Sequence, residues 1–258
     1  MSVAQLTSVL RTSACCAFLV FVLVHALGSE QDAEETNAVA EFALKYDGRV
    51  GPVRVGKLEA LLTVQNDTYE LDGSIVGTGP LKRLLKWQGE FTAKGVFQEE
   101  RPITTSYQLT ESEKRGDETE IKIIRILEST AFVSETGKPD IEIPAPEGID
   151  MMSFMLVNAS CAEDMVVHDG EDPFQIKLKH PGEDRKLRQG RKYYSGEAEM
   201  CRYEFIYDED EIRKVDIWLA EVDGRKVPVR IRIRIPVIPD GVFKLRLLDD
   251  KESEISSP

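Results

Sequence analysis

The chain has 258 residues and is acidic, with 46 Asp and Glu against 33 Lys and Arg and a formal charge of -13. That length suits one large domain or two small ones and can bury a sizeable core. The surplus of carboxylates argues against nucleic acid as a partner of the whole molecule, and only a local basic patch could attract an anionic surface.

Residues 1–28 have the composition of a secretory signal peptide. Arg11 precedes an apolar run from Ala14 to Leu27, and the small residues Ala26 and Gly28 offer a cleavage site. The run is shorter than the ~20 residues that span a bilayer, so cleavage near Gly28 is favoured over a retained membrane anchor. We therefore expect an exported protein.

An acidic, flexible leader (residues 29–39) precedes a β-rich first half, residues 40–138. Apolar and polar side chains alternate there with the period of a β-strand. The strands predicted from this pattern cover residues 42–46, 53–64, 69–76, 89–97, 103–109 and 120–127. Asp47-Gly48 is predicted to be a turn, and the charged stretch 111–119 a hairpin loop.

Gly77-Thr78-Gly79-Pro80 interrupts the strand pattern, and Leu81, Leu84 and Leu85 follow at helical spacing before Trp87. A short helix is expected, with Pro80 near its start. It is either a connector whose leucines fill the core or a lid over a concave sheet.

Pro139, Pro144 and Pro146 form the longest break in the pattern and suggest a joint between two halves, 40–138 and 148–248. Asp150 is a suitable N-cap for a second short helix, Met151 to Asn158, which is apolar almost all round and should be buried. Its methionines, Met152 and Met155 among them, suit irregular core gaps or irregular apolar ligands.

The second half, residues 148–248, returns to the strand pattern. The predicted strands cover residues 165–167, 174–178, 201–207, 215–220, 227–235 and 242–248. His168-Asp169-Gly170 and Asp223-Gly224 are predicted turns, and the charged stretch 180–192 a loop. The polar tail, residues 249–258, is expected to be disordered.

Val227 to Ile235 shows the strictest alternation in the chain, with Val and Ile on one face and Arg230, Arg232 and Arg234 on the other. If this strand pairs with residues 242–248, Lys244 and Arg246 join the same basic patch. The patch is either a site for an anionic ligand or a solvated face, whose charges Asp216, Glu221 and the acidic loop balance and on which Trp218 stacks on an arginine.

Cys161 and Cys201 are the cysteines that remain after cleavage, and in an oxidising compartment they are expected to form a disulfide. Two free thiols or a pair of metal ligands are the alternatives. No CxxC exists, and only His168 and His180 remain, so no metal site is predicted.

No GxSxG, HExxH or phosphate-binding loop occurs, and both remaining histidines lie in turn or loop contexts. We therefore predict no catalytic residues and no cofactor, and we expect a non-catalytic protein. An exported hydrolase is the least favoured reading.

The order of several short segments over residues 40–248 resembles a known family. The segments are Thr78-Gly79 followed by Trp87, the two cysteines, Asp169-Gly170, and Trp218 followed by Pro228-Val229-Arg230. They resemble the exported bacterial proteins grouped as domain-of-unknown-function family three-one-zero-eight. None of these segments is a catalytic signature.

The resemblance implies a periplasmic, mainly β protein with a curved antiparallel sheet. By likeness to the lipoprotein-carrier fold, it implies a half-open barrel with two short helices over its concave side. A lipid-like or amphiphilic envelope ligand would then lie beneath the helices. The apolar contacts expected for it are Leu81, Leu84, Leu85, Trp87, Met152 and Met155. The alternative is an envelope interaction or scaffold protein that contacts a protein partner through its outer sheet face.

Overall fold

The computed structural model describes residues 39–79, 86–115, 118–208, 211–234 and 239–247. The predicted signal peptide, nearly all of the leader and the tail lie outside the described residues. The same holds for Leu81, Leu84 and Leu85, so the first predicted helix has no structural counterpart to compare. Trp87 is described, and it lies in a β-strand.

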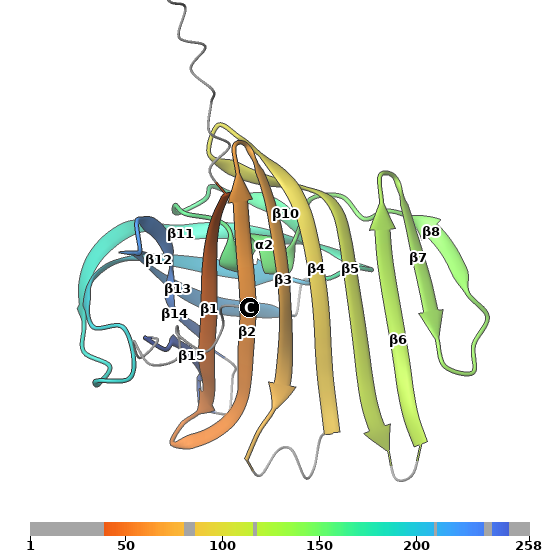
Figure 1. The fold of residues 1–258 in the computed structure, drawn as a ribbon, viewed down its shortest axis with the longest axis horizontal. Coiled ribbons are helices and arrows are strands. Elements are labelled where there is room, and N and C mark those ends of the chain that lie inside the picture. Colours follow the sequence, from red (N-terminus) through yellow and green to blue (C-terminus); the bar gives the residue numbers. More distant parts are fainter. Residues whose placement is uncertain (1–38, 80–85, 116–117, 209–210, 235–238, 248–258) are drawn as a thin grey trace, which may run out of the picture. The chain divides into compact units, whose positions relative to one another are not determined.

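The described residues contain fifteen strands, which form one curved sheet (Figure 1). The first half of the chain supplies β1 (Val39–Val50), β2 (Val53–Gln65), β3 (Thr68–Gly77), β4 (Lys86–Gln98), β5 (Arg101–Arg115), β6 (Glu118–Leu127), β7 (Thr130–Glu135) and β8 (Ile141–Pro144). The second half supplies β9 (Ile149–Asp150), the helix α2 (Met151–Leu156), β10 (Met165–His168), β11 (Pro173–Leu187), β12 (Gly196–Ile206), β13 (Ile212–Val222), β14 (Arg225–Arg234) and β15 (Gly241–Leu245).

The sheet is open, and its two halves meet where β1 pairs with β15. Its strand order runs from β8 back to β1, then from β15 back to β9. All neighbouring strands are antiparallel except β9 and β10. The proline-rich segment 139–148 therefore connects the two ends of the sheet. The predicted curved antiparallel sheet is confirmed, and α2 is the one helix among the described residues.

Helix α2 lies between the two halves of the curved sheet, with β1–β8 on one side of it and β10–β14 crossing on the other (Figure 1). Tyr69 of β3 hydrogen-bonds Ser153, while the Phe154 ring packs edge-on against Tyr203 of β12 at 5.3 Å between centroids. The alternating apolar side chains of both halves fill the space around the helix. Burying them drives the sheet to curve around the helix.

The strictly alternating strand near the end of the chain is β14, as predicted. Val227, Val229 and Ile231 are buried, and the arginines between them lie on the other face. The preceding turn is also confirmed, since Asp223 and Gly224 have φ values of 52° and 78°, as a two-residue hairpin with matching twist requires.

The predicted turn at Asp47-Gly48 is wrong, because both residues lie inside β1 and the chain reverses at Gly51-Pro52 instead. Asp47 is buried and accepts hydrogen bonds from Arg54 at 2.7 Å and from Tyr193 at 2.8 Å. A β-carbon on Gly48 would lie 3.0 Å from the Phe243 ring, so a larger side chain there would have to displace the ring. Tertiary contacts override the local turn preference.

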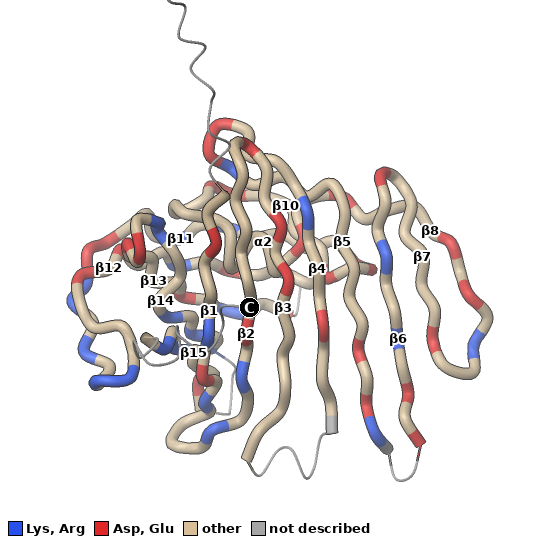
Figure 2. Tube along the Cα trace, in the orientation of Figure 1, with Lys and Arg blue, Asp and Glu red and all other residues tan. Residues whose placement is uncertain are grey.

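Two charged stretches predicted to be loops are strands over much of their length. β5 extends to Arg115 and β6 begins at Glu118, while β11 runs on to Leu187. Their backbones pair with neighbouring strands, and acidic and basic residues lie along the ends of β5 and β6 where the two strands approach their connection (Figure 2). The stretch of β11 from residue 179 to 186 is exposed on both faces, so it carries charge without the alternation of a half-buried strand.

Cys161 and Cys201 form a disulfide across a sequence separation of 40 residues. The prediction is confirmed, and the free-thiol and metal-ligand alternatives are wrong. Cys201 lies in β12 and is fully buried, so the bond ties the segment after α2 to the second half of the sheet.

Candidate ligand-binding cavity

Helix α2 forms one wall of the candidate site, and its first turn is fixed by the N-cap residue Asp150. Asp150 accepts a hydrogen bond from the Ser153 backbone amide at 2.8 Å, and this satisfies one of the free donors of the first turn. Ser153, Phe154 and Leu156 are buried. Met151 and Met155 remain partly exposed, and both line a cavity between the helix and the sheet.

This first cavity has a volume of about 210 Å³ and an almost wholly apolar lining. Its walls come from both halves of the sheet as well as from α2. The lining residues are Tyr46, Leu58, Ile75, Met151, Met152, Met155, Phe205, Tyr207, Arg213, Val215, Ile231, Ile233 and Phe243. Only the pairing of β1 with β15 brings these strands together, so the cavity is a product of long-range topology.

A second cavity of about 570 Å³ adjoins the first and is more polar. The two share the lining residues Ile75, Met151, Met152, Tyr207 and Arg213. We call them together the α2 cavity. Trp87, Phe91, Tyr107 and Leu109 add apolar wall to the second part.

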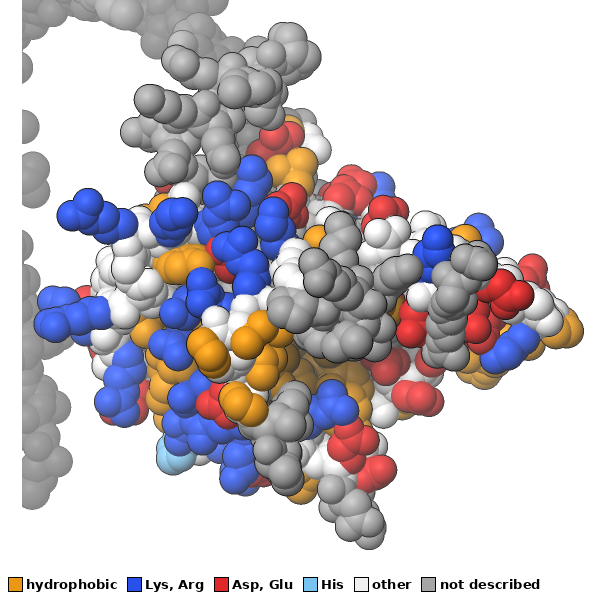
Figure 3. Space-filling view, turned by 90° about the horizontal axis from the view of Figure 1, so that it is seen from below, with side chains coloured by type: hydrophobic (Ala, Val, Ile, Leu, Met, Phe, Trp, Pro, Cys, Tyr) orange, Lys and Arg blue, Asp and Glu red, His pale blue; other side chains and the backbone are white. Residues whose placement is uncertain are grey.

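Charged side chains line the second part of the α2 cavity. Lys122 pairs with Glu171, and Arg213 pairs with Glu211 and lies over the Tyr207 ring at 4.8 Å. The α2 cavity therefore has an apolar end joined to an end lined by several charged groups. Seen from below, apolar side chains are visible in a recess between regions of opposite charge (Figure 3).

A buried polar cluster holds α2 in place behind the cavity. Thr104 of β5 donates a hydrogen bond to Asp150 at 2.6 Å, and Tyr69 of β3 donates one to Ser153 at 3.0 Å. Burial, and next the charge of Asp150, raise the pKa of Tyr69 to about 12. The tyrosine is therefore a neutral donor at physiological pH, and the cluster is a structural anchor for the helix.

His168 lies beside this cluster, buried, with its ring edge-on to Tyr107 at 5.8 Å between centroids. Its Nδ1 atom is buried and has no hydrogen-bond partner among the described residues. Burial lowers the pKa of His168, and the carboxylates of Asp150 and Asp169 raise it less. A neutral imidazole is therefore favoured at this position.

The structure brings together some of the predicted ligand contacts. Met152 and Met155 line the apolar part of the α2 cavity, and Trp87 lines the second part. Sequence reasoning missed Met151, Ile75 and the Tyr207–Arg213 pair. The pair flanks an acidic turn, and nothing in its local pattern indicates that it faces β3 and α2.

The predicted basic patch lies on the outer face of the same strands that line the cavity. Residues paired across neighbouring strands share a face, so the register defines a set that we call the basic face. It comprises Arg49, Arg54, Lys57, Arg202, Lys214, Arg230, Arg232, Arg234 and Lys244. Arg246 lies next to it, where its backbone amide bonds Lys45 of β1.

Asp216 lies at the centre of the basic face and is fully buried. It accepts hydrogen bonds from Arg202 and Arg232 Nε at 2.8 Å each and from Arg234 at 2.6 Å. Burial raises the pKa of Asp216, but these three guanidinium groups outweigh burial and lower it overall. Three cations thus share one carboxylate.

Trp218 lies beside Asp216 on β13 and is nearly buried beneath two arginines. The Arg230 and Arg232 guanidinium carbons lie 4.7 Å and 5.4 Å from its ring. The predicted stacking of Trp218 on an arginine is therefore present, and Asp216 does contact the arginines of β14.

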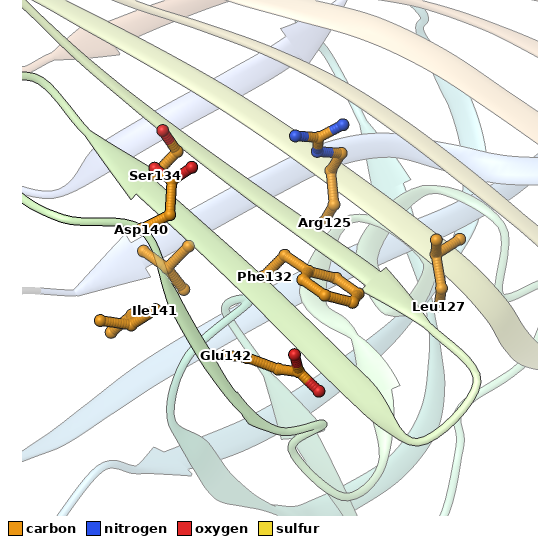
Figure 4. Close-up of a pocket in the computed structure, with 8 residues that line it drawn as sticks. Arg125, Leu127, Phe132, Ser134, Asp140, Ile141 and Glu142 are labelled. Carbon is orange, nitrogen blue, oxygen red and sulfur yellow. The ribbon is translucent and has the colours of Figure 1, made fainter.

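A shallow depression of about 410 Å³ lies over β6, β7 and β8, at one end of the sheet (Figure 4). Leu127, Phe132 and Ile141 are large apolar side chains that are exposed there by 55%, 40% and 51%. Arg125 and Glu142 flank the Phe132 ring. Arg125 and Leu127 alternate along β6 with Ile124, which lines the second part of the α2 cavity, so the depression and the cavity lie on opposite faces of that strand.

Nowhere in the part of the chain that the structure describes do three or more His, Cys, Asp or Glu side chains gather as metal ligands would. Among the same residues, no helix has the length and apolar composition of a transmembrane span.

Comparison with protein families gives a match to the model described as "Protein of unknown function (DUF3108)", over residues 41–247. The chain belongs to this family. The resemblance stated from the sequence is therefore confirmed. No curated protein matches the chain. One similar solved structure is titled as a beta-barrel-like protein of domain of unknown function DUF1849 from Brucella abortus. The identity is 8%, the TM-score is 0.45, and the match covers 82% of this chain and 96% of that one.

Proposed function

We propose that this protein binds an amphiphilic envelope molecule, with the apolar part of the ligand in the α2 cavity. The observation that carries the proposal is a cavity whose apolar part adjoins a charged part across a shared wall. Such a site shields hydrocarbon from water and leaves a headgroup near ion-pairing side chains.

The methionines of α2 support a ligand of variable shape. Met151, Met152 and Met155 all line the apolar part, and their unbranched, polarisable side chains adapt to different packing partners. The role we propose for the molecule is binding or carrying the ligand, without chemical conversion of it.

The place of action that we propose is the periplasm. The signal-like residues 1–28 support export, and the Cys161–Cys201 disulfide is typical of an oxidising compartment.

Titration of the protein with a fluorescent long-chain fatty acid, followed by displacement with unlabelled lipid, tests the proposal. Ile75 lies where the two parts of the cavity meet, so Ile75→Trp should fill this space and weaken binding about ten-fold or more. Ile75→Phe, a smaller change, should give an intermediate loss.

Ile123→Trp is the matched control, because Ile123 is also a half-buried isoleucine on a strand but lies on the face of β6 opposite Ile124. Its binding should equal that of the unmodified protein. Equal probe affinity in all of these variants, with unfolding curves that show them folded, would contradict the proposal.

A second candidate function is docking of an envelope protein on the outer sheet face. The exposed Leu127, Phe132 and Ile141 at the β8 end of the sheet favour it (Figure 4). Native mass spectrometry of the protein purified from its own envelope separates the two functions, since the first predicts bound amphiphile and the second a bound protein.

A further inference from the structure

The basic face is the feature that ligand binding in the α2 cavity does not use. Its side chains lie on the outer face of β12–β15, β1 and β2, while the cavity lies on the inner face of these strands. A concentration of cations is unexpected in a chain with a formal charge of -13, and ligand binding in the α2 cavity does not explain it.

Among the described residues, the carboxylates on this face are fewer than its cations. Glu59 and Glu204 share the face by register, and Asp240 lies 3.9 Å from Arg232. The other two carboxylates are buried. Asp216 is fully buried and is shared by three arginines, and Asp47 is buried beneath Arg54 and Tyr193. A partner that approaches the face therefore meets an excess of guanidinium and ammonium groups over carboxylates.

Several cations on the face have no anion of their own. Within the described residues, Arg230 and Lys244 form no ion pair, and they stack on Trp218 and Tyr193 instead. The Arg230 Nε atom is buried, and no residue that the structure describes accepts a hydrogen bond from it. Burial, and next the neighbouring Arg230 and Arg49, lower the pKa of Lys244. Arg230 and Lys244 therefore repel each other across the β14–β15 pair.

We infer that the basic face docks this protein on a membrane surface rich in anionic phospholipid. The cations extend over several adjacent strands instead of converging on a cleft, which suits laterally mobile lipid phosphates. An acidic peptide would be better held at a free strand edge, and β12–β15, β1 and β2 are all interior strands of the sheet.

The inference goes beyond the proposed function and stands without it. If both hold, docking brings the ligand site close to the bilayer. Lysine and arginine gather on the side where β11–β15 lie, next to the apolar recess visible in the same view (Figure 3).

Flotation with phosphatidylcholine vesicles, with and without phosphatidylglycerol, tests the inference on protein purified in its mature form from its own cells. Binding should require phosphatidylglycerol and should disappear at high salt, because the Debye length shortens. The phosphatidylcholine vesicles report any attraction that comes from apolar segments.

Lys57→Glu combined with Lys214→Glu reverses two charges on the face without breaking an ion pair among the described residues. Each lost cation should weaken binding about five-fold, so this variant should lose at least about 25-fold. The matched control is Lys114→Glu with Arg125→Glu, which changes the net charge equally on exposed parts of β5 and β6.

The control variant should keep its binding within about three-fold, because its charges lie outside the basic face. Equal losses in the two variants, or binding that ignores phosphatidylglycerol, would overturn the inference. The inference would also be overturned if the protein did not bind the vesicles but bound an acidic protein through the basic face. That result would assign the face to a protein partner. The fatty-acid titration is run on the same variants. Flotation then reports membrane docking, and the titration reports ligand binding, so failure of one is distinguished from failure of the other.

Discussion

Tyr69 on β3 donates a hydrogen bond to Ser153 on α2, with 3.0 Å between the two buried hydroxyl oxygens. The residues are 84 positions apart in the sequence. This bond fastens the helix of the second half to a strand of the first, and so fixes one wall of the α2 cavity.

Tyr69→Phe removes the donor and leaves the Ser153 hydroxyl buried without that partner. The free energy of unfolding in urea should fall by about 1–3 kcal/mol. Tyr194→Phe is the control, because the Tyr194 hydroxyl bonds the Glu197 carbonyl in an exposed position, and it should change stability by less than about 0.5 kcal/mol. Equal effects would show that the buried bond does not hold the helix.

Asp216→Asn removes the single carboxylate that Arg202, Arg232 and Arg234 share. We expect a loss of about 3 kcal/mol in unfolding free energy, since removing one partner of a buried ion pair leaves uncompensated charge. Glu183→Gln, which breaks an exposed pair with Arg185, should cost less than about 1 kcal/mol. A smaller loss for Asp216→Asn than for Glu183→Gln would be inconsistent with the network.

The ion-pair network of Asp216 should also affect how the free energy of unfolding changes at acid pH. Because the pKa of Asp216 is lowered from its ordinary value of 3.8, its stabilising contribution is complete above that value. The contribution is lost as the pH falls further, through the folded-state pKa. Asp216→Asn should therefore remove part of the decline in stability below pH 3.8.

We expect His168 to cause a second pH dependence of the free energy of unfolding, at higher pH than that of Asp216. Its folded-state pKa is lowered from 6.5 by burial, so its neutral form contributes stability that is complete above pH 6.5 and declines as the pH falls below it. One proton sets a limit of about 1.4 kcal/mol per pH unit on this slope.

Urea unfolding at a series of pH values from neutral downward measures the effect of His168. The decline below pH 6.5 should flatten in His168→Gln and remain in His180→Gln, because His180 is exposed. An unchanged slope in His168→Gln would assign the decline to other groups.

Reduction of the Cys161–Cys201 bond should destabilise the protein. The chain-entropy model for a separation of 40 residues gives about 4 kcal/mol, which urea unfolding with and without reductant measures. The double variant Cys161→Ala with Cys201→Ala should have the lower free energy of unfolding with and without reductant, because it has no disulfide to reduce. Equal stability of the oxidised and reduced protein would contradict this prediction.

Local patterns were sufficient to predict most strands, several turns and helix α2. Val227, Val229 and Ile231 are buried as their alternation predicts, and Asp150 caps the helix. The errors have physical causes. Asp47-Gly48 has turn chemistry but is held in β1 by Arg54 and Phe243, and strand ends beyond the core carry charge as loops do.

The candidate site was predictable only in part. Met152 and Met155 were identified from their apolar helix, because that signal is local. Ile75 and Tyr207 could not be identified from the sequence. They line the same cavity only because β1 pairs with β15 and the second half of the sheet folds across α2. No pattern within one strand records which distant strand it will face.

Native mass spectrometry of the protein purified from its own envelope tests the central proposal most directly. We predict a population heavier than the bare polypeptide by the mass of an amphiphile, which organic extraction removes. We predict that Ile75→Trp lacks this population and that Ile123→Trp keeps it. A bare polypeptide mass in all three proteins would contradict ligand binding in the α2 cavity.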